Sequence, residues 1–179
     1  MHMKSKKPSE SFATMTELVF PNDTNILGNL MGGKLLHWMD IVSAISASKH
    51  CNRICVTASV DFVDFNSPIH LAEIVLLEAF VTRAFTTSME VRIDVWAENM
   101  QQVAGKRYCN SAYYTFVAVD QSGRPIPVPP VEPETENKRA LLWAAKVALE
   151  QLNPTVPADN EEPAQITASW RTAGTEAQL

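Results

Sequence analysis

A side-chain amide, a pair of glycines and a carboxylate lie close together near the start of the chain, at Asn25, Gly32, Gly33 and Asp40. The glycine pair opens a helix, and the first N–H groups of a helix lack intrahelical partners and carry partial positive charge. They can therefore bind an anion or a polarised carbonyl oxygen, while a carboxylate can act as a base or a nucleophile. Together these residue types indicate a catalytic site.

The helix that positions Asp40 is expected to span Lys34–Ser48 and to be buried, because apolar residues occur on every side of it. Asp40 is its only carboxylate, and burial of a carboxylate is costly unless a partner stabilises it or the protein uses it. The alternative is a structural carboxylate bonded to a neighbouring subunit or loop, and Asn25 alone is typical of an Asx turn. The combination of the three features favours catalysis.

Several segments after this helix are expected to form strands. Apolar residues alternate with polar ones in two of them, Val56–Phe62 and Met89–Trp96. Long strands in meander after one buried helix predict an α+β protein, in which a curved antiparallel sheet wraps around a long central helix. The expected strands are Ala13–Phe20, Val56–Phe62, Ile74–Phe85, Met89–Trp96 and Tyr108–Val119.

One domain is expected over residues 13–152, with tails at 1–12 and 153–179. The prolines between Pro125 and Pro133 favour an extended arm. Thr135 suits the N-cap of a second, C-terminal helix over about Glu136–Leu152.

Composition excludes several classes of protein. The formal net charge of −5 argues against a nucleic-acid-binding protein, which needs a basic face. No apolar run is long enough for a membrane span, and the N-terminus lacks the apolar segment of a signal peptide. Cys51, Cys55 and Cys109 show no metal-site spacing, so we expect no metal and free thiols in a reducing, cytoplasmic compartment.

Four blocks carry a family resemblance. They are PNDTNILGNLMGGKLLHWMD, VTASVDFVDFNSPI, TSMEVRIDVWAE and GKRYCNSAYYTFVAVDQSGRPIPVP, and in this order they cover roughly Ala13–Leu152. They resemble the hot-dog-fold acyl-CoA thioesterases, in the branch of the cytosolic long-chain acyl-CoA hydrolases and YciA-type bacterial enzymes. One position differs, because Met31 stands before the glycine pair where such enzymes often have His or an aromatic residue.

The resemblance implies hydrolysis of fatty acyl-CoA to a free acid and CoA, with no cofactor beyond the CoA of the substrate. N–H groups at Gly32 and Gly33 would receive the oxyanion, and Asn25 would position the water or the carbonyl. Asp40 would act as general base or as nucleophile. The alternatives are a non-catalytic acyl-CoA-binding module and a hot-dog dehydratase or hydratase, for which His37 is the only candidate histidine.

The helix geometry predicts that two chains build the site. Gly32 and Asp40 are eight positions apart, which is about 12 Å along one helix. A base must lie within about 3 Å of its target, or one water away. We therefore expect Asp40 to come from a two-fold partner. Hot-dog enzymes are similar in that they dimerise with their sheets side by side and their helices together, and a trimer of such dimers gives the expected hexamer.

Substrate-binding residues follow from resemblance and charge. Pantetheine is expected to pass the turn Thr86-Thr87-Ser88, and Phe65 is expected along the acyl channel, together with the apolar faces near Trp38 and Met39.

The CoA phosphates are assigned to Arg83, Lys106 and Arg107. Each of these cations, taken singly, is interpreted equally well as a solvated charge at the end of a strand.

Overall fold

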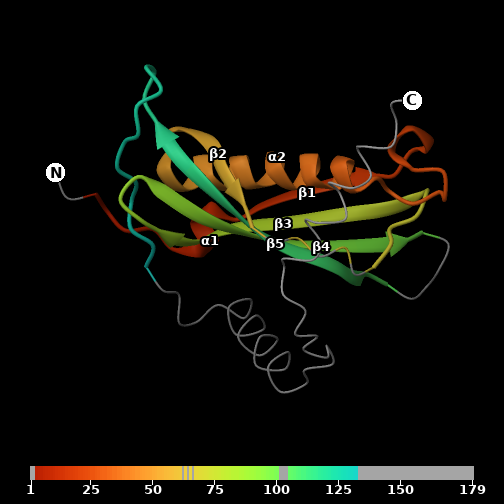
Figure 1. Cartoon of the computed structure of the whole chain (residues 1–179). Helices are drawn as coiled ribbons and strands as arrows, with labels where there is room; N and C mark the ends of the chain where they lie inside the picture. The colour runs from red at the N-terminus through yellow and green to blue at the C-terminus, as the bar shows by residue number, and fades with distance from the viewer. Residues whose placement is uncertain (1–2, 62, 64, 66, 101–104, 133–179) are drawn as a thin grey trace, which may run out of the picture. The chain divides into compact units, whose positions relative to one another are not determined.

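The computed structural model describes residues 3–61, 63, 65, 67–100 and 105–132. Five antiparallel strands form one sheet in the order β1-β3-β4-β5-β2, and the long helix α2 lies across one face of that sheet (Figure 1). The elements are α1 (Pro8–Ser11), β1 (Ala13–Leu18), the 3-10 helix η1 (Pro21–Asp23), α2 (Gly32–Cys51), β2 (Ile54–Val60), β3 (Glu73–Ala84), β4 (Ser88–Asn99) and β5 (Arg107–Val119).

The core lies between α2 and the sheet. In β4 the alternation predicted from the sequence is confirmed, because Met89, Val91, Ile93 and Val95 are fully buried. Burying one such side chain contributes roughly 1.5–3 kcal/mol, so this row fixes which face of the sheet meets the helix. The inward rows of β3 and β5 and one side of α2 complete the core, with Val75, Leu77, Ala79, Val81, Ala112, Tyr114, Phe116, Leu35, Trp38, Met39 and Val42.

The expected α+β architecture, a curved antiparallel sheet around a central helix, is confirmed. The expected C-terminal helix and the C-terminal tail lie outside the described residues. No helix among residues that the structure describes is long and apolar enough to cross a membrane.

Helix α2 differs from the expectation in extent and in burial. It begins at Gly32, so the glycine pair forms its first turn, and it ends at Cys51 before Asn52, whose φ of 53° is left-handed. The single chain does not bury every side of the helix, and the sequence predicts that a second copy packs against it. Ile45 is 46% exposed, and Ile41 is half-buried, because the sheet covers only one side of the helix.

Strand β2 lies at an edge of the sheet, with β5 on one side. Its apolar side chains are exposed, including Ile54, Val56 and Val60. The pairing with β5 shifts register between Thr57 and Ser59, which interrupts the alternation expected from Val56 onward. Phe62, the last residue of the expected strand, lies outside the described residues.

The segment assigned to an N-terminal tail contacts the sheet. Lys6 pairs with Val131, and the Ser11 hydroxyl accepts a 2.9 Å hydrogen bond from the Val81 N–H. Ser11 is fully buried.

Candidate active site

The first turn of α2 presents the backbone N–H groups of Gly32 and Gly33. The carbonyl of Met31 accepts the N–H groups of Lys34 and Leu35, at 3.0 and 3.1 Å. The N–H groups of Gly32 and Gly33 donate to no residue that the structure describes. The positive end of the helix dipole can therefore receive an anion at the position where the sequence places the oxyanion donor.

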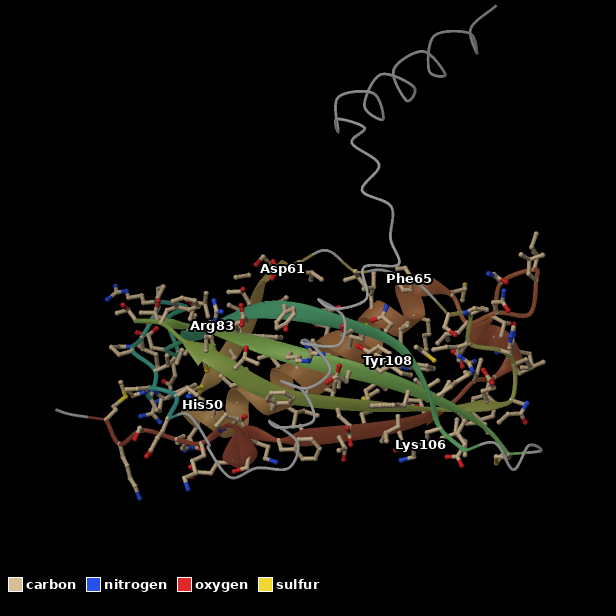
Figure 2. All side chains as sticks on the ribbon, turned by 90° about the horizontal axis from the view of Figure 1, so that it is seen from below. His50, Asp61, Phe65, Arg83, Lys106 and Tyr108 are labelled. Atoms are coloured by element: carbon tan, nitrogen blue, oxygen red, sulfur yellow. The ribbon has the colours of Figure 1, made fainter. Side chains whose placement is uncertain are left out.

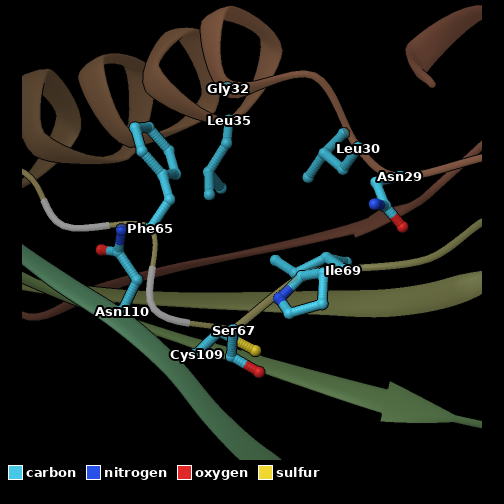
Figure 3. Close-up of a pocket in the computed structure, with 10 residues that line it drawn as sticks. Asn29, Leu30, Gly32, Leu35, Phe65, Ser67, Ile69, Cys109 and Asn110 are labelled. Carbon is cyan, nitrogen blue, oxygen red and sulfur yellow. The ribbon is translucent and has the colours of Figure 1, made fainter. Parts of the chain in front are cut away.

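A cavity of about 320 Å³ lies against this turn (Figure 3). The Phe65 ring packs on Gly32 so closely that a Cβ at position 32 would lie 3.3 Å from Cζ, whereas a Cβ at Gly33 would meet nothing within 4 Å. A side chain at position 32 would therefore press on the Phe65 ring. Its walls are mostly apolar, and they are formed by Asn29, Leu30, Gly32, Leu35, Phe65, Ser67, Pro68, Ile69, Cys109 and Asn110.

Asn25 lies in the loop before α2, and its side-chain oxygen closes that loop. Oδ1 accepts the N–H groups of Leu27 at 2.9 Å and of Asn29 at 3.2 Å. The Asx turn is therefore present. These two bonds also fix the carboxamide, while Nδ2 donates to no described residue and stays available for a ligand.

The Asn25 loop is fixed against the opposite wall of the cavity. The Leu30 N–H donates to the Ile69 carbonyl at 2.7 Å, and the Leu71 N–H donates to the Gly28 carbonyl at 3.0 Å. Arg107 holds the same wall from β5, with bonds to the Ser67 hydroxyl at 2.9 Å, the Pro68 carbonyl at 2.8 Å and the Glu73 carboxylate. The position of this wall thus depends on a guanidinium whose Nη atoms are already engaged.

The Asp40 carboxylate of α2 lies next to the edge strand β2 and is half-buried in the single chain. The sequence predicted a buried carboxylate that is either paired or used in the reaction, and in the single chain its burial is only partial. Thr57 of β2 donates to Asp40 Oδ1 at 2.6 Å. Nothing in the sequence pointed to Thr57 beyond its being a polar residue on an alternating strand.

A buried phenol lies near the same carboxylate. The Tyr114 hydroxyl donates to the Leu36 carbonyl at 3.3 Å. Burial raises the pKa of Tyr114 to about 12, and the negative charge of Asp40 adds to the shift. Tyr114 therefore stays neutral beside Asp40 at physiological pH.

Gly32 and Asp40 belong to one uninterrupted α-helix. Eight residues of α-helix place them about 12 Å apart along its axis, so the two groups of one chain do not face the same small substrate atom. The length of the helix thus separates the Gly32 turn from the hydrogen-bonded pair Asp40 and Thr57.

The comparisons with known proteins identify the family. The Thioesterase superfamily model matches residues 27–104. An uncharacterized acyl-CoA thioester hydrolase of Bacillus subtilis, YkhA, is 46% identical over 130 residues, which cover 72% of this chain and 74% of YkhA. The chain belongs to the hot-dog acyl-CoA thioester hydrolases. The rat cytosolic acyl coenzyme A thioester hydrolase is 36% identical over 132 residues, which are 73% of this chain. The rat protein is longer, and the match covers only 35% of its length.

Solved structures support the same assignment. A hexameric acyl-CoA thioesterase aligns with a TM-score of 0.72 and 41% identity, over 83% of this hydrolase and 95% of that chain. An acyl-CoA hydrolase of Staphylococcus aureus aligns with a TM-score of 0.71 and 33% identity, over 97% of this chain and 99% of the staphylococcal chain. The staphylococcal structure contains butyryl coenzyme A and coenzyme A. Variants of the staphylococcal enzyme carry alanine in place of an asparagine, an aspartate or a threonine.

The cations that the sequence assigned to CoA phosphates do not gather in one place in this hydrolase. Arg83 lies near the end of β3 and pairs with Glu90 at 3.8 Å, whereas Lys106 precedes β5 at the other end of the sheet (Figure 2). Arg107 is used to hold the cavity wall, which favours a structural role over both interpretations made from the sequence.

The turn Thr86-Thr87-Ser88 also lies far from the cavity of the same chain. Ser88 pairs with Val117, eight residues along β5 from Cys109, which corresponds to about 26 Å. The Thr86 and Thr87 carbonyls accept N–H groups from Val128 and Ala118, at 3.1 and 3.0 Å. One acyl-CoA molecule would therefore contact both the Thr86-Thr87-Ser88 turn and the first turn of α2 most easily if the two turns belong to different chains.

The two glycines provide a matched pair of variants. Gly32→Ala should lower kcat/KM for acyl-CoA, because its methyl group must displace Phe65 at the cavity. Gly33→Ala has free space and should keep near-normal activity, and both variants retain the backbone N–H. Thiol release with each variant measures the difference. Equal activities would show that the contact between Gly32 and Phe65 is irrelevant to the substrate.

Proposed function

We propose that this protein hydrolyses fatty acyl-CoA at a site shared by two chains. Asn25, Gly32 and Gly33 come from one protomer, and Asp40 with its hydrogen-bond donor Thr57 comes from the two-fold partner. The observation that carries the proposal is the single helix α2, which holds Gly32 and Asp40 too far apart for one chain to apply both to one thioester.

The variants made in the staphylococcal enzyme support the choice of Asn25, Asp40 and Thr57 as site residues. The replaced asparagine, aspartate and threonine are separated by 15 and 17 positions in that enzyme. Asn25, Asp40 and Thr57 have the same two separations here. The Asp40–Thr57 hydrogen bond joins the second and third of these residues, which favours one functional unit.

Two uncovered surfaces supply a dimer interface. The uncovered side of α2 carries apolar Ile45, and the edge strand β2 exposes Ile54, Val56 and Val60. Both suit burial against a second copy, with β2 edges extending the sheet and helices packing together. We extend this to a trimer of dimers because a related thioesterase is hexameric, and to a cytosolic location because the rat relative is cytosolic.

In the proposed reaction, the N–H groups of Gly32 and Gly33 polarise the thioester carbonyl and bind the developing oxyanion. The Asn25 Nδ2 donor holds the carbonyl or the water. Asp40 of the partner subunit activates a water as general base, or attacks directly and forms an anhydride that water then opens. The thiolate of CoA leaves without a strong general acid, since it is a much better leaving group than an alkoxide.

The acyl group is proposed to enter the cavity at Gly32. Its apolar walls, including Leu30, Leu35 and Phe65, suit a hydrocarbon chain. The sequence placed Trp38 and Met39 near this channel, but both are buried in the core, at 4% and 0% exposure, and neither lines the cavity.

The CoA phosphates are assigned to Arg83 and Lys106. Because the two cations lie at opposite ends of the sheet (Figure 2), either protomer of the dimer can supply each of them to the shared site. Arg83→Glu and Lys106→Glu should each raise KM for acyl-CoA up to about fivefold, the scale of an exposed ion pair, and added salt should reduce the effect. Hydrolysis of acyl-pantetheine, which lacks the nucleotide phosphates, should change little. Equal effects on both substrates would show that these cations are merely solvated.

A further inference from the structure

Two cysteine thiols meet where α2 joins β2. Cys51 is the last residue of the helix and Cys55 is the second residue of the strand. Their Sγ atoms lie 3.2 Å apart, and each thiol also lies 3.7 Å from the Arg53 carbonyl. Asn52, with its left-handed φ of 53°, makes the sharp turn that brings them together. The sequence interpretation as unrelated free thiols did not foresee this contact.

The two thiols have unequal acidity. The hydrogen bond from Cys55 lowers the pKa of Cys51 to about 7, although burial opposes the shift. The pKa of Cys55 is raised by its hydrogen bond to Cys51 and by burial. A thiolate stabilised by a neighbouring thiol is the arrangement of an attacking and a resolving cysteine.

Cys109 provides a contrast within the same chain. It is 2% exposed on β5, and burial raises the pKa of its thiol. Its sulfur contacts the Arg107 guanidinium at 3.0 Å rather than a second thiol. Cys109 therefore serves as an internal control for general thiol oxidation.

We propose that Cys51 and Cys55 form a redox-active dithiol that low-molecular-weight disulfides close into an intramolecular disulfide. The Cys51 thiolate attacks one sulfur of the small disulfide, which breaks its S–S bond and releases one thiolate. Cys55 then loses its proton and attacks Cys51 Sγ in the mixed disulfide, releasing the second small thiolate. Both released thiolates become thiols on taking up protons. Two protein thiols are thus oxidised by two electrons, and one small disulfide is reduced to two thiols.

The test is equilibration of the full chain in buffers with increasing ratios of oxidised to reduced glutathione, followed by alkylation, peptide mapping and mass measurement. The native protein should lose the mass of two hydrogen atoms, with the new bond between Cys51 and Cys55 and with Cys109 still alkylated. Closure in the native protein should need at least about tenfold less oxidised glutathione than in guanidinium-denatured chain, since folding already holds the sulfurs together.

Two variants separate this proposal from general oxidation. Cys55→Ser should accumulate glutathione on Cys51 because the resolving thiol is absent, whereas Cys109→Ser should close like the unchanged protein. The proposal is overturned if both thiols stay alkylated at every ratio, if glutathione accumulates on the unchanged protein, or if native and denatured chains close at the same ratio.

Discussion

Replacing Asp40 with asparagine is expected to lower kcat by at least ~10²-fold, the usual scale for loss of a general base. The asparagine would keep the size of the side chain and an oxygen for the Thr57 hydroxyl, but its amide cannot take a proton from water or attack the thioester. The variant should therefore fold and bind CoA normally. Thiol release from saturating acyl-CoA measures kcat, and thermal unfolding and CoA calorimetry test the fold and the binding.

Two matched variants serve as controls for the Asp40→Asn result. Asp61→Asn removes an exposed carboxylate just beyond β2 and should leave kcat near normal. Thr57→Val removes the 2.6 Å hydrogen bond to Asp40 and should cost less than Asp40→Asn, because the base remains but is less well held. A folded Asp40→Asn protein with near-normal kcat would remove Asp40 from the mechanism.

The fold could be predicted where periodicity was strong. The alternation in β4 placed Met89, Val91, Ile93 and Val95 inward, and this is what the structure shows. Periodicity was weaker at the edge strand, where the register shift after Thr57 breaks the pattern. In α2 the apolar residues were interpreted as buried on all sides, but a single chain leaves Ile45 exposed. An apolar pattern gives no indication of whether the covering surface belongs to the same chain.

The candidate site could be predicted only in part. The Asn25, Gly32 and Asp40 frame is local in sequence, so the residues themselves drew attention. The contact between Asp40 and Thr57 joins α2 to β2 through the fold, and no spacing rule links the two residues. Sequence spacing did not reveal the partners of Arg107 either. Its charge suggested that it binds a CoA phosphate, but it bonds to Ser67 in the loop before β3 and to Glu73, the first residue of β3.

Asn25→Ala is expected to reduce turnover on the order of 10-fold to 10³-fold, because it removes a positioning donor and loosens the loop that Oδ1 closes. Asn25→Asp is the sharper variant, since it keeps the acceptor oxygen for Leu27 and Asn29 but lacks Nδ2. If Nδ2 contacts the substrate, Asn25→Asp should be as inactive as Asn25→Ala. Activity close to normal in Asn25→Asp would limit Asn25 to shaping the loop.

The shared site is tested most directly by complementation between Asn25→Ala and Asp40→Ala chains, refolded together in equal amounts. In a mixed dimer one site collects both substitutions, and the other collects both intact residues. Random assembly makes about half of the dimers mixed, each with one working site of two, so about a quarter of wild-type activity should return. Neither variant alone should show it. Verified mixed dimers without any recovery would show that Asn25 and Asp40 act within one chain, and would contradict the two-chain site.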